Sequence, residues 1–160
     1  MKKILIFIAL LASVIARAQV STVSLQAGGL TCSMCSNAIN KSLKTLDFIQ
    51  DVYADIKTYT FIISFRPGID IDFDKIKNKV ESAGFTVNAF VATIYFENVQ
   101  VTESQPVIMQ DKTLLFQQVT EQVLDGEKKV RLLDKGFVSA KEFKRNLFPA
   151  SPAHTYHVSL

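Results

Sequence analysis

The residues best suited to chemistry are the two cysteines of the segment Cys32-Ser33-Met34-Cys35, and they are the only cysteines in the chain. They can therefore form a local disulfide, act as a redox dithiol or hold a metal ion. A disulfide between them would close a very small loop, and the stabilisation from a cross-link grows with loop length. A purely structural disulfide is accordingly the weakest of the three interpretations.

A redox dithiol is the second interpretation, because a C-x-x-C pair at a helix start can have a lowered thiol pKa and exchange disulfides. Two features of the sequence weigh against it. The chain contains no tryptophan, which thioredoxin-like sites usually carry beside the first cysteine. The first proline after the pair, Pro67, lies in the turn-like segment Arg66-Pro67-Gly68 and not in a context that would place a cis-proline opposite the thiols.

A soft-metal site is the third interpretation. Two thiolates separated by two residues can converge on one ion when the first lies in a loop and the second in the first turn of a helix, where unpaired N–H groups favour negative charge. Soft sulfur ligands favour copper(I), whereas zinc usually takes four ligands. Cys32 and Cys35 therefore predict a copper(I) site, with mercury(II) or zinc as alternatives, and Met34 is expected to point to solvent.

The hydrophobic periodicity predicts the elements that position this pair. A helix is expected over residues 33–46, with Cys35 in its first turn and an apolar stripe of Ala38, Ile39, Leu43 and Leu46. A second helix is expected to begin after Asp70 or Asp72 and to end at Gly84. Strands are expected at 23–27, 52–56, 59–65 and 85–96. The order βαββαβ predicts a ferredoxin-like α+β sandwich with two helices on one face of an antiparallel sheet.

The segment Gly29-Leu30-Thr31-Cys32-Ser33-Met34-Cys35 resembles the Gly-Met-Thr-Cys-x-x-Cys signature of heavy-metal-associated domains. That family includes copper chaperones, the metal-binding modules of copper-transporting ATPases and the periplasmic mercury-binding protein. Ala83-Gly84-Phe85 resembles a second family motif, and the likeness covers about residues 20–96. It implies Cys32 and Cys35 as ligands, no enzymatic activity, and a metal donor or acceptor such as a copper-transporting ATPase or a cuproenzyme as partner. Leu30 stands where the family usually has a methionine of similar volume that packs under the loop.

Residues 1–18 have the pattern of a cleavable signal peptide. Lys2 and Lys3 precede an apolar run over residues 4–15, and Ala16-Arg17-Ala18 offers a small-x-small cleavage site. The run is shorter than the roughly 20 residues of a spanning helix, so an uncleaved anchor is the less favoured alternative. The sequence thus predicts a soluble periplasmic or secreted protein, cleaved after Ala18 and without stable membrane insertion.

The composition excludes several classes of protein. The chain has 160 residues, of which 48% are apolar and 21% charged, as in ordinary globular proteins. Its net charge is +3, but three basic residues lie in the expected signal peptide, so the remainder is close to neutral. Without a basic surplus or stripe, nucleic acid is not an expected partner.

The second half is less informative. Residues 19–97 are expected to form the heavy-metal-associated domain, 98–112 a linker or edge strand around Pro106, and 113–160 a β-rich extension with a mobile tail. Ser139 and Glu142 have the spacing of a capping box for a short helix. His154 and His157, the only histidines, are expected to be solvated in the tail, with a separate copper(II) site as the alternative hypothesis. An interaction module that senses metal and recognises a membrane partner is a third functional alternative.

Overall fold

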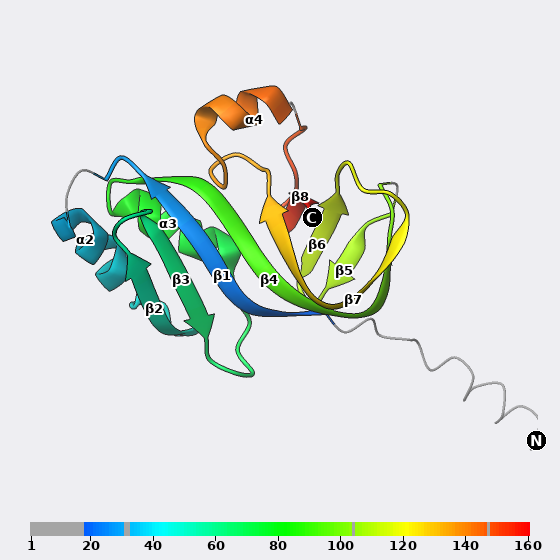
Figure 1. Cartoon of the computed structure of the whole chain (residues 1–160), viewed down its shortest axis with the longest axis horizontal. Coiled ribbons are helices and arrows are strands. Elements are labelled where there is room, and N and C mark those ends of the chain that lie inside the picture. Colours follow the sequence, from blue (N-terminus) through cyan, green and yellow to red (C-terminus); the bar gives the residue numbers. More distant parts are fainter. Residues whose placement is uncertain (1–17, 31–32, 104, 147) are drawn as a thin grey trace, which may run out of the picture.

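The computed structural model describes residues 18–30, 33–103, 105–146 and 148–160 (Figure 1). Most of the expected signal peptide, together with Thr31 and Cys32, lies outside the described residues. The described residues form one eight-stranded sheet and three helices. The elements are β1 Ala18–Gly28, α2 Ser33–Leu43, β2 Ile49–Asp55, β3 Thr60–Phe65, α3 Phe73–Ser82, β4 Thr86–Val101, β5 Val107–Met109, β6 Lys112–Phe116, β7 Gln122–Leu132, α4 Ala140–Asn146 and β8 Thr155–Ser159.

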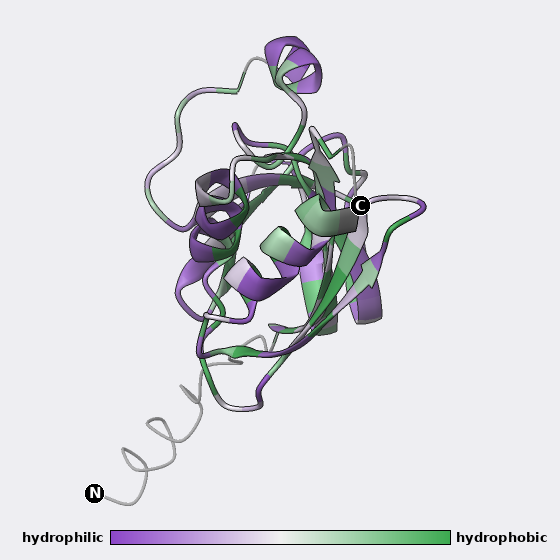
Figure 2. Cartoon of the chain, turned by 90° about the vertical axis from the view of Figure 1, so that its left-hand side faces the viewer, coloured by the Kyte–Doolittle hydropathy of each residue, from purple (hydrophilic) through white to green (hydrophobic). Residues whose placement is uncertain are grey.

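The first half has the expected ferredoxin-like βαββαβ order, so that prediction is confirmed. β1 pairs antiparallel with both β3 and β4, and β2 pairs with β3. Figures 1 and 2 show α2 and α3 on one side of this sheet, and the Ser42 hydroxyl donates to the Lys79 carbonyl across the two helices at 3.0 Å. The helices bury Ile39 and Ile76 against the sheet, whereas Ala38, expected in the buried stripe, is exposed.

α2 ends at Leu43, earlier than the expected residue 46, because the chain tightens into i→i+3 hydrogen bonds at Thr45 and Leu46. α3 has both expected caps. The Asp72 carboxylate accepts a hydrogen bond from the Lys75 N–H at 2.9 Å. Gly84 has a φ of 90°, and the N–H groups of Gly84 and Phe85 donate back into the last turn, which is a Schellman ending.

Replacing Gly84 by alanine should lower the free energy of unfolding by about 1 kcal/mol, because a side chain is strained at positive φ. Among the described residues other than its two chain neighbours, none has a heavy atom within 4 Å of the added Cβ, so the loss would be conformational and not steric. Urea unfolding measures it. Gly84→Asn is the matched control and should lose less, since asparagine tolerates this conformation; equal losses in the two variants would contradict the explanation.

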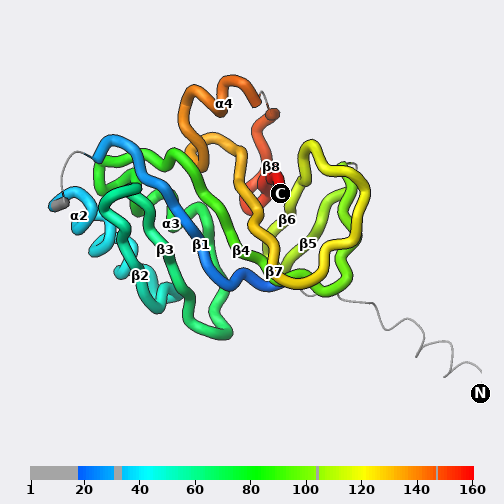
Figure 3. Tube along the Cα trace, viewed as in Figure 1, coloured from blue at the N-terminus to red at the C-terminus, as the bar shows by residue number. Residues whose placement is uncertain are grey.

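The second half extends the same sheet instead of following a linker. β4 continues past residue 97, through an irregularity between Phe96 and Val99, and pairs with β7 as far as Val101. Val99 and Val101 are buried, so the apolar alternation of β4 continues into the segment expected to be a linker. The edge-strand alternative holds for β5, which lies at one edge of the sheet. The order of the strands across the sheet is β2-β3-β1-β4-β7-β8-β6-β5. The tube in Figure 3 follows the chain from one strand to the next.

The expected mobile tail is instead strand β8, and that prediction is wrong. β8 lies between β7 and β6, parallel to β6 and antiparallel to β7. Tyr156, His157 and Val158 are all buried. The turn-rich segment before β8 gave no local sign of a strand. The strands that pair with β8 lie tens of residues away along the chain.

The two halves also share a hydrophobic core. The Phe137 ring lies 5.2 Å from that of Phe90 in β4 and 5.5 Å from that of Tyr156 in β8, between ring centres. Tyr156 in turn packs 5.5 Å from Phe73 at the start of α3. Within the described part of the chain, no helix combines the length and apolar character that crossing a membrane requires.

Candidate metal centre

The structure places one of the two expected ligands. Cys35 lies in the first turn of α2, half-buried and packed against the core. Cys32 lies outside the described residues, so the geometry of the pair stays a prediction. β1 carries the chain to this loop and ends at Gly28, after which Gly29 has a φ of 82°. The loop therefore joins a central strand to a helix start, as expected for the site.

The base of the loop is closely packed. A Cβ on Gly28 would lie 2.6 Å from the Asn88 side chain and 2.7 Å from the Thr86 hydroxyl, so the two strand ends approach in a way that glycine permits. Leu30 is buried and Phe85 packs partly buried against the core. Both residues are therefore part of the packed core, whereas the packing of the loop itself stays a prediction.

The surroundings of Cys35 favour a negative charge. The first turn of α2 carries no acidic side chain in its described residues, and the N–H groups of a helix start attract anions. Met34 is 80% exposed, as expected for a side chain that points to solvent. Ser36, next to Cys35, is only 3% exposed, and its hydroxyl has no hydrogen-bond partner among the described residues. The helical stripe could have indicated its burial, since Ser36 is three residues before Ile39.

The two histidines lie apart in separate environments. The His157 Nδ1 lies 2.7 Å from the Asp134 Oδ1, and the ring stacks on Phe148 at 4.4 Å between ring centres. The His154 Nδ1 lies 3.3 Å from the Asp111 Oδ2, within ion-pair distance but without the geometry of a hydrogen bond. Among the residues that the structure describes, no three histidine, cysteine or carboxylate side chains are grouped to hold a metal. The structure thus gives no support to a copper(II) site at His154 and His157.

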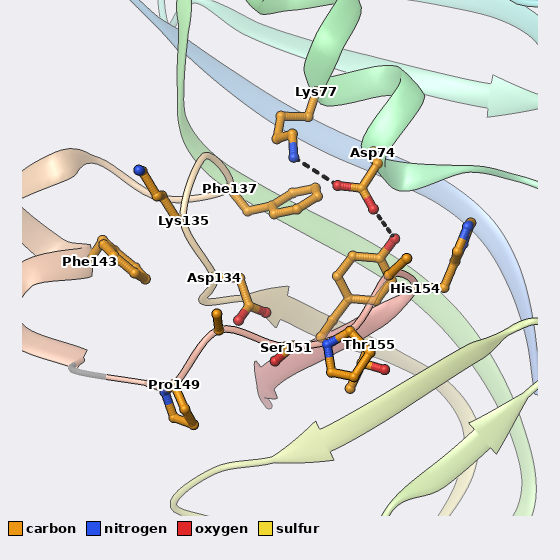
Figure 4. A pocket seen from close by; sticks show the side chains of 14 residues that line it. Asp74, Lys77, Asp134, Lys135, Phe137, Phe143, Pro149, Ser151, His154 and Thr155 are labelled. Carbon is orange, nitrogen blue, oxygen red and sulfur yellow. Dashed lines mark hydrogen bonds and ion pairs between the residues drawn. The ribbon is translucent and has the colours of Figure 1, made fainter.

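A polar network that the sequence did not indicate connects α3 to the extension (Figure 4). The Tyr156 hydroxyl donates to the Asp74 Oδ2 at 2.8 Å, and the Lys77 ammonium donates to the Asp74 Oδ1 at 2.7 Å. These groups line a cavity of about 290 Å³. Their polar atoms are paired with one another, and Asp74 and Tyr156 are 82 residues apart in sequence. The network therefore serves to hold the extension on α3.

Asp74 couples this contact to pH. Burial raises the pKa of Asp74, but the hydrogen bonds from Lys77 and Tyr156 outweigh it, so its pKa lies below the usual value. Burial and the Asp74 carboxylate raise the pKa of the Tyr156 hydroxyl well above its usual value. The ionised Asp74 paired with a neutral Tyr156 is therefore the stable form at neutral pH.

Asp74→Asn should lower the free energy of unfolding at neutral pH. It should also make this free energy fall less steeply as the pH is lowered. A carboxyl with a depressed folded pKa contributes stability above its unfolded pKa of about 3.9, and this stability disappears as the pH falls through the folded value. Urea unfolding between about pH 7 and pH 3 measures the slope. Asp47→Asn, at an exposed carboxylate, is the control, and an equal change of slope in both variants would contradict the assignment.

Comparison with known proteins agrees with this geometry in the first half of the chain. Residues 24–86 match the model of the heavy-metal-associated domain family. No curated protein sequence matches the chain.

Three similar solved structures each cover about two fifths of the chain. The CopZ metallochaperone is 18% identical, covers 42% of this chain and 98% of its own, and has a TM-score of 0.39. The yeast copper transporter domain Ccc2a is 29% identical, covers 41% of this chain and 88% of its own, and has a TM-score of 0.36. A copper-binding domain from HMA7, a P-type ATPase, is 24% identical, covers 42% and 90%, and has a TM-score of 0.39. Residues 24–86 therefore match the heavy-metal-associated domain family, and the elements of this half have the ferredoxin-like order.

Proposed function

We propose that the protein binds copper(I) between the thiolates of Cys32 and Cys35 and passes it to another protein, without acting as an enzyme. The observation that carries the proposal is a heavy-metal-associated domain over residues 24–86 that contains both cysteines, with Cys35 in the first turn of α2. Two thiolates suit a soft ion of low coordination number, so mercury(II) is the next candidate and zinc the least suited.

Transfer would follow from the position of the pair between a strand end and a helix start. Cys35 is only half-buried, so a thiolate of the partner can reach an ion held there and bind it before either original bond breaks. Tight binding is then compatible with fast transfer. Both thiols must lose their protons to bind, so copper affinity should fall as the pH falls. A copper-transporting ATPase or a cuproenzyme would be a suitable donor or acceptor.

We also propose export to the periplasm or the medium after cleavage behind Ala18. Ala18 is the first residue of β1, and its removal takes away only the first register pair of β1 with β4. N-terminal sequencing of the mature protein tests this step. In an oxidising compartment the cysteine pair would need a reductant or a bound metal to stay open.

Anaerobic titration of the reduced full chain with copper(I), against a competing chelator, tests the proposal. Tight binding of one ion per chain supports it, and an insulin-reduction assay on the same sample should then give no turnover. Turnover without tight copper binding would overturn the proposal in favour of a thiol–disulfide oxidoreductase.

A further inference from the structure

A groove of about 880 Å³ lies between α3, the start of β4 and the segment that leads into α4. Its floor is apolar, with Val87 of β4 and Val138 of the extension both buried, and Phe143 of α4 half-buried on its wall. The groove exists only because the extension packs beside the heavy-metal-associated domain. It is therefore a feature that residues 24–86 alone could not form.

Both walls of the groove are held in place. Gly136 approaches α3 so closely that a Cβ there would lie 2.8 Å from the Lys77 side chain. The Ser139 hydroxyl accepts a hydrogen bond from the Glu142 N–H at 3.3 Å, which is half of the expected capping box. The Glu142 carboxylate instead pairs with Arg131 of β7 at 2.8 Å. The groove is thus preformed, which lowers the entropic cost of filling it.

The charges on the rim indicate what the groove would bind. Lys135 and Lys144 line it with exposed ammonium groups, whereas Lys77 is already paired with Asp74. Glu81 of α3 is the one carboxylate among the described lining residues. The ribbon of α4, at the top of Figure 2, has the colour of hydrophilic residues over most of its length, and α4 carries Lys144 and Arg145 in its last turn. The α4 side of the groove is therefore positively charged.

We propose that this groove binds a segment of a partner protein in which an apolar side chain is flanked by aspartates or glutamates. The apolar side chain would occupy the floor, and the carboxylates would face Lys135 and Lys144. Exposed lysines on flexible stems suit the charged rim of a protein interface, whereas small-molecule sites depend on a few precisely placed polar groups.

The groove adjoins the end of β1, where the loop toward the cysteines begins. Thr86 and Asn88 line it, and the same two side chains would contact a Cβ on Gly28 at the end of β1. A segment bound here would lie beside the base of that loop. Identifying its owner as the metal donor or acceptor rests on the proposed function, whereas the binding of the segment itself does not.

Titration of the full chain, without metal, with two synthetic peptides tests the groove by NMR. One peptide has a central phenylalanine flanked by aspartates, and the other has lysines in place of the aspartates. The acidic peptide should shift the signals of Val87, Val138 and Phe143, and the lysine peptide should not. Reversing both rim charges, with Lys135→Glu and Lys144→Glu, should weaken binding by about tenfold.

Lys129→Glu is the matched control, because Lys129 is an exposed lysine of β7 that does not line the groove, and it should leave the affinity unchanged. Phe143→Ala should weaken binding through the apolar contact alone. Equal binding of the two peptides, shifts confined to other surfaces, or no binding would overturn the proposal. The charge-reversed protein should still bind copper(I) normally, so a failure at the groove is distinguishable from a failure at the cysteines.

Discussion

Replacing Cys35 by serine is expected to remove tight copper(I) binding while the fold remains intact. The variant keeps one thiolate, and a serine hydroxyl is a hard donor that a soft ion binds poorly. Changes in the outer shell of a metal site alone cost about ten- to a hundredfold in affinity, so loss of a ligand should cost more than about a hundredfold. Competition with a chromogenic copper(I) chelator, under anaerobic and reducing conditions, measures the loss.

Met34→Ala is the matched control, since Met34 lies next to Cys35 in α2 but is 80% exposed. It should bind copper(I) as tightly as the unaltered protein. A similar loss in both variants would mean that the methionine is a ligand or that the loop itself has been disturbed. Cys32→Ser should match Cys35→Ser, and the far-ultraviolet circular dichroism of all three variants should be unchanged.

Replacing Phe137 by alanine is expected to destabilise the whole molecule, by about 3–5 kcal/mol. Phe137 is buried among the rings of Phe90 and Tyr156, with the Lys77 ammonium 4.9 Å from its ring centre. Phe90 belongs to β4 and Phe137 to the extension, so the cavity would open in the core that both halves share. Urea unfolding followed by circular dichroism and by NMR signals from both halves measures the effect.

The unaltered protein should unfold in a single transition, because β4 and β7 pair along most of their length in one sheet. Phe137→Leu, which keeps most of the volume, should cost much less and remains measurable even where the alanine variant fails to fold. Separate transitions for residues 18–97 and for the extension, with the first unaffected by Phe137→Ala, would contradict a shared core.

Much of the first half was predictable because its signals are local. Asp72 begins α3 and Gly84 ends it, through interactions with residues one to four positions away. The apolar alternation of β1 and β3 follows from the two-residue period of a strand. The same holds for the candidate ligand Cys35, whose place in the first turn of α2 follows from the helical pattern around it. The position of Cys32 relative to it remains a prediction.

The second half was harder to predict because its contacts are distant in sequence. β8 reads locally as a tail after Pro149 and Pro152, and it is a strand only because β6 and β7 lie on either side of it. Lys112 is fully buried, although a lysine is rarely buried unless its charge is paired. The burial is possible because the ammonium group pairs with Asp111 and lies 5.5 Å from the ring centre of Phe73. Such partners come together only in the folded chain.

The sequence by itself determined the order of the first six elements, the caps of α3 and the place of Cys35 at a helix start, since each depends on residue types at short spacing. Only the tertiary structure decided that the extension continues the sheet, that Tyr156 joins Asp74 of α3, and that a groove opens beside α4. These features depend on pairings between segments far apart along the chain, and no local pattern of side chains specifies which distant segment will supply the partner.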